Sequence, residues 1–132
     1  MPVYFIIIDC MRLDQYLGIG QCFPVPEGEE LELYYSILPT ATPYSRNAIW
    51  SGLYPLEIQT RHPQWWLPAD EKESGRNRHE KDLMAELLRR HGVDAESSRF
   101  TKVYTAMEGN NLRKRIGTLG EIRFLGFVFN FL

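Results

Sequence analysis

The sequence predicts an α/β fold in which a mostly parallel sheet carries helices on both faces. Apolar runs of strand length alternate with helical patterns along the chain, an order typical of βαβ units. The first run, Val3–Ile8, is continuously apolar instead of alternating with polar residues, as in a strand that is buried on both faces of a parallel sheet. Hydrophobic residues make up 44% of the 132 residues, which is enough for the core of one domain.

Composition disfavours several classes of protein. Fifteen Lys and Arg against seventeen Asp and Glu leave a net charge of −2, which disfavours binding of nucleic acid through a uniformly basic surface. Val3–Ile8 is far shorter than the roughly 20 residues that span a bilayer, and no charged segment precedes it as in a signal peptide. We therefore expect a cytoplasmic protein without membrane insertion. Cys10 and Cys22 fit no disulfide framework or zinc-ligand spacing and are predicted to be buried free thiols.

The N-terminal elements follow in order from these patterns. Val3–Ile8 is predicted to be a central strand, and the segment Met11–Cys22 can hold a short helix that its two glycines weaken. A second strand is predicted at Leu31–Leu38, where Tyr and Ile favour β-structure, and Pro39 ends it.

A short helix is predicted directly after this strand. Thr42 fits its N-cap, where a hydroxyl accepts a backbone hydrogen bond, and Pro43 fits the first helical position. Gly52 fits the position just beyond the helix end. A threonine hydroxyl is therefore expected at a strand-to-helix turn.

The C-terminal half continues the alternation. Leu53–Pro68 is irregular and aromatic, and the charged segment Ala69–Arg78 is interpreted as a solvated loop. The amphipathic pattern of His79–His91 predicts a helix that Gly92 ends. The remaining predicted elements are a strand at Phe100–Tyr104, a helix at Asn110–Leu119 and a strand at Phe124–Leu132.

Two candidate functional residues lie at the carboxyl ends of predicted strands, where ligands bind in such sheets. Asp9 ends the first strand, and it either caps the next helix or binds a divalent metal through its carboxylate. Thr42 follows the second strand, and it either only caps its helix or acts as a nucleophile. The nucleophilic role requires a metal that deprotonates the alcohol, and a helix N-terminus favours a phosphoryl group nearby.

The segments around these two residues resemble a known family. They read IIIDCMRLDQ at residues 6–15 and YYSILPTATPYSRNAIWSGL at residues 34–53, and they are similar to the PglZ domain of the alkaline phosphatase superfamily. The similarity is closest to the C-terminal domain of PorX-type response regulators, which are associated with type IX secretion. Further stretches agree, namely Gly75–Glu80, Glu108–Leu112 and Val128–Leu132. The resemblance covers nearly the whole chain and implies an alkaline-phosphatase-like core.

The resemblance also implies catalytic roles. The pattern Pro39-Thr40-x-Thr42 lines up with the nucleophile segment of nucleotide pyrophosphatases and phosphodiesterases of the same superfamily. Thr42 would then attack phosphorus and contact the metal, and Thr40 is the less favoured candidate. Asp9 would be a ligand of the metal that activates Thr42.

Three further residues are candidate contacts of the substrate phosphate: Asn47, Arg46 and Arg12. The alternative for Asn47 is an ordinary polar position on a helix face. The alternative for each arginine is a structural salt bridge.

The resemblance implies two zinc ions, which in two-metal sites lie about 4 Å apart. Asp9 and Thr42 alone cannot hold both. Relatives supply the remaining Asp and His ligands from segments after the strand that Phe127–Leu132 resembles. We therefore expect residues 1–132 to be the N-terminal part of a PglZ domain, truncated before the second set of metal ligands. The three histidines fall at none of the family's ligand positions and are predicted to be surface or helix-face residues: His62, His79 and His91.

Two functions from different classes follow. In the first, the chain is part of a zinc-dependent phosphodiesterase or phosphatase domain of a two-component response regulator, which acts on oligonucleotide or cyclic-nucleotide phosphodiesters in the full protein and is inactive as this chain alone. In the second, it is a non-catalytic interaction module or a decayed gene fragment. Trp65, Trp66 and an unfinished sheet edge would then contact a partner or a second copy in a homodimer. A dinucleotide-binding fold is a weaker alternative, because no glycine fingerprint follows Val3–Ile8.

Overall fold

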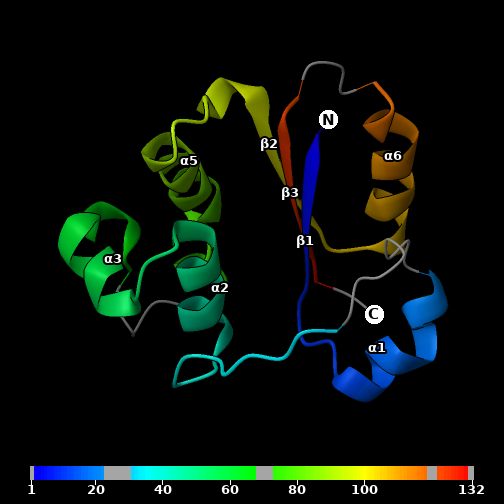
Figure 1. Ribbon diagram of the computed structural model, residues 1–132, viewed down its shortest axis with the longest axis horizontal. Helices are drawn as coiled ribbons and strands as arrows, with labels where there is room; N and C mark the ends of the chain where they lie inside the picture. Colours follow the sequence, from blue (N-terminus) through cyan, green and yellow to red (C-terminus); the bar gives the residue numbers. More distant parts are fainter. Residues whose placement is uncertain (1, 23–30, 68–72, 119–121, 131–132) are drawn as a thin grey trace.

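A parallel three-stranded sheet lies at the centre of the protein. The computed structural model describes residues 2–22, 31–67, 73–118 and 122–130. Its strands are β1 (Val3–Ile8), β2 (Ser98–Val103) and β3 (Phe124–Phe129), in the order β1-β3-β2. Both pairs are parallel, and the register places Val3 and Ser98 on either side of Phe124. The carboxyl ends of the three strands therefore lie together at one edge of the sheet (Figure 1).

Helices lie on both faces of this sheet, which confirms the predicted fold class. Figure 1 shows α2 (Thr42–Ser51) and α5 (Glu80–Arg90) on one side, with α3 (Pro55–Arg61) outside them. The helices α1 (Leu13–Ile19) and α6 (Ala106–Ile116) lie on the other side. In the described residues no helix is both long and apolar enough to cross a membrane.

The main core lies between the sheet and the α2/α5 layer. Trp50 of α2 and Leu83 and Met84 of α5 are almost fully buried against Val128 of β3. A glycine in β3 allows this close approach, because a Cβ at Gly126 would lie 2.8 Å from Met84 Sδ. The α6 helix buries none of its residues completely. The main hydrophobic core therefore lies on the α2/α5 side of the sheet. Both helices also carry residues that form ion pairs near the carboxyl ends of the strands.

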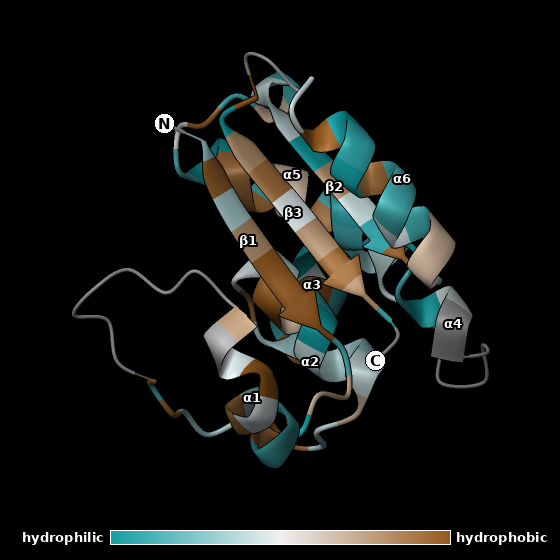
Figure 2. Ribbon diagram, turned by 90° about the vertical axis from the view of Figure 1, so that its right-hand side faces the viewer, coloured by the Kyte–Doolittle hydropathy of each residue, from teal (hydrophilic) through white to brown (hydrophobic). Residues whose placement is uncertain are grey.

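The opposite face of β1 is only partly covered. Phe5 contacts the Trp50 ring, with the ring centroids 5.2 Å apart, so it faces α2. Since side chains alternate along a strand, Tyr4 and Ile6 face the other way. Both are about half exposed. Figure 2 views the sheet from this side and shows α6 beside β2 while the ribbon of β1 stays in view.

The predicted strand Leu31–Leu38 is not a strand in this structure. The segment has no regular secondary structure, and most of its side chains are exposed. Tyr34 to Ile37 instead line a groove of about 380 Å³ together with α2 residues such as Ile49. The Tyr and Ile residues that suggested a strand favour any half-buried surface, and without a ladder partner that preference does not make a strand.

Several predicted element boundaries also differ. The segment Leu53–Pro68 is not irregular, since Pro55 begins α3 and a 3₁₀ turn, η2, follows at Pro63–Trp65. The last helix begins at Ala106, four residues earlier than predicted, because Thr105 caps it by accepting a hydrogen bond from Glu108 N at 3.2 Å. The last strand ends at Phe129, and residues 131–132 lie outside the described residues.

The charged segment Ala69–Arg78 is only partly a solvated loop. Residues 69–72 lie outside the described residues, and Glu73–Arg76 form the short helix α4. Asn77, at the end of this segment, is buried. Its amide meets a buried carboxylate, which a sequence pattern of alternating charges does not reveal.

The two cysteines are free, as predicted, but both are exposed rather than buried. Cys10 directly follows the end of β1, where the backbone has a φ of 59°. This turn takes its side chain out of the sheet and leaves it beside the strand ends. Cys22 ends the turn η1 (Gly20–Cys22) after α1 and is exposed to solvent.

Candidate functional site

Asp9 and Thr42 line the same cavity at the carboxyl ends of the strands. The cavity has a volume of about 380 Å³. Its lining residues come from the ends of the strands, from α2 and from the segment before α5: Asp9, Cys10, Thr42, Arg46, Asn77, Lys102, Tyr104 and Asn130. Two residues that are 33 positions apart in sequence therefore face one space.

Thr42 is the first residue of α2 and not its N-cap, contrary to the prediction. The N-cap is Ala41, whose carbonyl accepts hydrogen bonds from Tyr44 N at 3.0 Å and Ser45 N at 3.1 Å. The Thr42 hydroxyl takes no part in capping and bonds to no other described residue, while the Thr42 carbonyl accepts from Asn77 Nδ2 at 3.5 Å. The hydroxyl is therefore available at the N-terminus of a ten-residue helix, where backbone N–H groups create positive potential.

Asp9 is held by Arg46, which reaches the strand ends from α2. Arg46 Nη1 donates to Asp9 Oδ2 and to Asn130 Oδ1, each at 2.9 Å. No described residue donates a hydrogen bond to the other carboxylate oxygen, Asp9 Oδ1. The Asp9 side chain is 22% exposed and lines the cavity.

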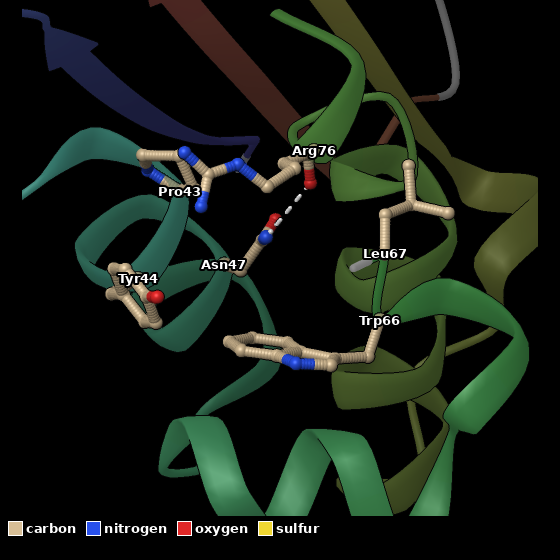
Figure 3. Close-up of a pocket in the computed structure, with 6 residues that line it drawn as sticks. All are labelled: Pro43, Tyr44, Asn47, Trp66, Leu67 and Arg76. Atoms are coloured by element: carbon tan, nitrogen blue, oxygen red, sulfur yellow. Dashed lines mark hydrogen bonds between the residues drawn. The ribbon is translucent and has the colours of Figure 1, made fainter. Parts of the chain in front are cut away.

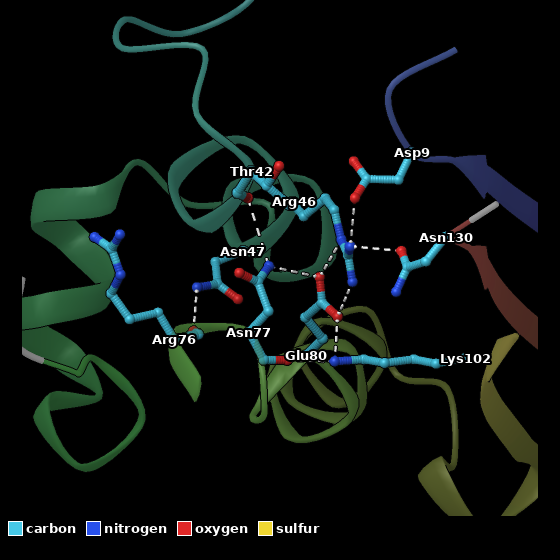
Figure 4. A network of polar contacts seen from close by, with 9 residues as sticks. All are labelled: Asp9, Thr42, Arg46, Asn47, Arg76, Asn77, Glu80, Lys102 and Asn130. Carbon is cyan, nitrogen blue, oxygen red and sulfur yellow. Dashed lines mark hydrogen bonds and ion pairs between the residues drawn. The ribbon is translucent and has the colours of Figure 1, made fainter. Parts of the chain in front are cut away.

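A buried carboxylate on α5 balances this arginine (Figure 4). Glu80 is 0% exposed and accepts from Arg46 Nε at 2.7 Å and from Arg46 Nη2 at 2.6 Å. Burial alone would lower the pKa of Arg46, but the hydrogen bonds and charge of Glu80, together with those of Asp9, raise it above its ordinary value. Arg46 therefore stays charged at every physiological pH.

Two more donors complete the network. Asn77 Nδ2 donates to Glu80 Oε1 at 3.0 Å, and Lys102 Nζ lies 2.8 Å from Glu80 Oε2. Lys102 Nζ also donates to the Asn77 carbonyl at 2.5 Å. Two cations, Arg46 and Lys102, thus face two carboxylates, Glu80 and Asp9. The network has no net charge and joins all three strands to α2 and α5.

Asn47 lies on another side of α2, in a separate pocket (Figure 3). Its side chain is 2% exposed, and its amide nitrogen donates to the Arg76 carbonyl at 3.0 Å. The pocket has a volume of about 50 Å³ and is lined by Pro43, Tyr44, Asn47, Trp66, Leu67 and Arg76. The Tyr44 and Trp66 ring centroids are 5.8 Å apart, and the Arg76 guanidinium lies 6.0 Å from the Tyr44 ring. The structure thus places two aromatic rings beside the first turn of α2.

The other predicted candidates do not line the Asp9/Thr42 cavity. Arg12 lies at the start of α1, is 72% exposed and pairs with Asp14. Thr40 is exposed before α2. The histidines have the expected positions, since His79 pairs with Asp82 at 2.9 Å and the His62 ring stacks on Trp65.

The described side chains fit part of a metal site. Asp9 Oδ1 and the Thr42 hydroxyl are two oxygen donors that face one cavity and have no other hydrogen-bond partner among the described residues. Ionised carboxylate and deprotonated hydroxyl are suitable ligands for zinc. Within the described ranges, no group of three or more His, Cys, Asp or Glu residues could enclose an ion. These residues can therefore contribute to a metal centre, but they do not complete one.

Sequence reasoning missed Glu80, Asn77, Lys102 and Asn130 as members of this site. Three of them stand in stretches that resemble the family, Gly75–Glu80 and Val128–Leu132, and this was the only available signal. No sequence signal pointed to Lys102, because a single lysine within a predicted strand is common.

A family model described as the BREX system PglZ alkaline phosphatase-like domain matches residues 2–128, which include the whole sheet up to Val128. No curated protein matches the chain at a significant level. The match includes both Asp9 and Thr42, the two residues that share the cavity. The chain therefore belongs to the PglZ family of alkaline phosphatase-like domains.

Proposed function

We propose that this chain supplies the nucleophile and one metal ligand of a zinc-dependent phosphodiesterase or phosphatase. The observation that carries the proposal is the shared cavity of Asp9 and Thr42, in a chain that belongs to an alkaline phosphatase-like family. Thr42 is the nucleophile, and Asp9 is a ligand of the metal. The full domain would contain two zinc ions.

The chemistry follows from the position of Thr42. Its hydroxyl loses its proton to solvent, its oxygen attacks phosphorus to form the new O–P bond, and the P–O bond to the leaving group breaks as that oxygen takes up a proton from solvent. A bound zinc ion would lower the pKa of this alcohol and offset charge in the transition state. The N–H groups of the first turn of α2 favour the phosphoryl oxygens on the same side. Because Asp9 and Thr42 are only two donors, we expect the isolated chain to bind zinc weakly and to show little turnover.

The proposed substrates are oligonucleotides or cyclic nucleotides. Support comes from Tyr44 and Trp66, which place aromatic rings close to the first turn of α2. Bases stack on such rings regardless of sequence, typically with about 1–3 kcal/mol per base. The resemblance of residues 6–15 and 34–53 supports the finer proposal of a cytoplasmic response regulator of the PorX type, associated with type IX secretion.

The proposal is tested by trapping the covalent intermediate. The chain is incubated with zinc and a chromogenic phosphodiester, and the peptide that holds Thr40 and Thr42 is analysed by mass spectrometry. One attack per chain is enough for detection, so even with little turnover we expect a phosphoryl adduct on Thr42, its loss in Thr42→Val and its retention in the matched variant Thr40→Val. An adduct on Thr40, or hydrolysis that Thr42→Val does not change, would show that Thr42 is not the nucleophile.

A second candidate function is an interaction module, and the exposed edge of β1 favours it. Val3, Tyr4, Phe5 and Ile6 are all at least 40% exposed, in a strand without the charges or prolines that usually protect an edge. A second copy that pairs along this edge would form a homodimer. Analytical ultracentrifugation of the wild type and of Ile6→Glu tests this function, which requires a dimer that the substitution dissociates.

A further inference from the structure

We propose that Arg46 is a positioning residue that fixes the orientation of the Asp9 carboxylate, and that Glu80 in turn fixes Arg46. The use of the Asp9 carboxylate as a metal ligand rests on the proposed function. The orientation of that carboxylate does not, because it follows from the contacts of the buried network alone. This role differs from a direct contact between Arg46 and a substrate phosphate.

The donors of Arg46 are nearly all occupied. A guanidinium has five N–H groups. One Nε–H and one Nη2–H bind Glu80, and the two Nη1–H groups bind Asp9 and Asn130. A bidentate phosphate contact needs two free N–H groups on one edge of the guanidinium. The remaining Nη2–H cannot provide it, and the side chain is only 6% exposed.

The two carboxylate oxygens of Asp9 differ in their hydrogen bonds. Oδ2 accepts from Arg46 Nη1 at 2.9 Å, so rotation of the carboxylate would break a charged hydrogen bond. Oδ1 has no hydrogen bond to another described residue. Arg46 therefore anchors one oxygen and leaves the other available in the cavity that Thr42 lines.

Glu80 makes this anchor rigid. Its two oxygens bind the Nε and Nη2 edge of Arg46, which prevents the guanidinium from turning about its own axis. Asn77 and Lys102 hold the same carboxylate from the other side. The orientation of Asp9 at the end of β1 thus depends on a residue of α5 that it does not touch.

The geometry is tested by NMR of the arginine side chain in the full chain. In the wild type, the Nη protons of Arg46 should give separate, slowly exchanging signals, because bonds to Glu80 and Asp9 block rotation of both Nη groups. Asp9→Asn should shift the Nη1 signals, and Glu80→Gln should abolish the separate signals. The matched variant Glu57→Gln, which removes the partner of the exposed Arg61, should leave them unchanged. Averaged Nη signals in the wild type, or Nη1 signals that do not respond to Asp9→Asn, would overturn the proposal.

The functional role is tested by zinc affinity, measured by competition with a chromophoric chelator. Arg46→Lys keeps the charge beside Asp9 but loses the guanidinium fork. Substitution of a residue that orients a metal ligand through a hydrogen bond typically weakens metal binding by about 10–100-fold. Leu83→Val, a core change on α5, controls for lost stability and should leave the affinity within about twofold. Zinc binding by Arg46→Lys that equals the wild type, or falls only as in Leu83→Val, would overturn the positioning role. A wild type that binds no zinc would refute the proposed function, and the NMR result would still decide the orientation of Asp9.

Discussion

The substitution Glu80→Gln is expected to destabilise the protein severely while preserving the shape of the side chain. Glu80 is 0% exposed, accepts three hydrogen bonds from Arg46 and Asn77, and forms an ion pair with Lys102. In the variant, the buried Arg46 and the partly buried Lys102 keep only Asp9 as a counter-charge, and the new amide group directs N–H donors at other donors. Removing one partner of a buried ion pair costs about 3–5 kcal/mol.

This loss of unfolding free energy corresponds to a fall in melting temperature. Unfolding entropy is about 2.1 cal/mol/K per residue, so for 132 residues the expected fall in Tm is roughly 10–18 °C. Differential scanning calorimetry and urea unfolding at neutral pH measure it. The matched control is Glu86→Gln on the same helix, where the partner Arg89 is 71% exposed and the expected loss is below about 1 kcal/mol. If Glu80→Gln lowers the free energy of unfolding no more than Glu86→Gln does, the buried network around Glu80 does not stabilise the fold.

Three further predictions concern stability. Gly126→Ala should lower the free energy of unfolding in urea by about 1–3 kcal/mol, because its Cβ would lie 2.8 Å from Met84 Sδ. The control Gly18→Ala in α1 should not destabilise the protein, because no atom lies within 4 Å of the new Cβ. Thr105→Ala should cost about 1 kcal/mol through loss of the α6 cap, while the exposed Thr60→Ala should stay within about 0.5 kcal/mol of the wild type. The hydrogen bond from Arg89 holds the pKa of Glu86 below its ordinary value of 4.5, so the wild type should lose stability relative to Glu86→Gln as the pH falls below about 4.5; equal acid unfolding of the two proteins would contradict this.

Much of the fold could be predicted because its signals are local. The continuous apolar run Val3–Ile8 forms a strand, and Gly52 ends α2 with a φ of 61°, which only a residue tolerant of the left-handed region adopts easily. The strand expected at Leu31–Leu38 failed because pairing depends on a neighbouring strand and not on composition. The exposed position of Cys10 depends on a turn whose backbone the sequence does not specify.

The two central residues of the candidate site could be predicted, but their exact positions in the elements could not. Asp9 and Thr42 each follow a local pattern, the end of a strand and the start of a helix. The packing of α2 against the sheet, and not a strand before Thr42, brings them to one cavity. The position of Thr42 within that pattern was wrong by one residue, since Ala41 is the N-cap. That shift matters for the chemistry, because a hydroxyl engaged in capping would be less available as a nucleophile.

The partner of Arg46 could not be predicted from sequence, and the first turn of α5 shows why. Glu80 and Asp82 both lie there, where acidic residues are common because they favour the helix dipole. Asp82 has that ordinary environment, about half exposed beside His79. Glu80, two positions earlier, points about 200° away around the helix axis and meets an arginine 34 residues distant. Identical local signals thus give a solvated charge at one position and a buried ion pair at the other, and only the packing of α2 on α5 separates them.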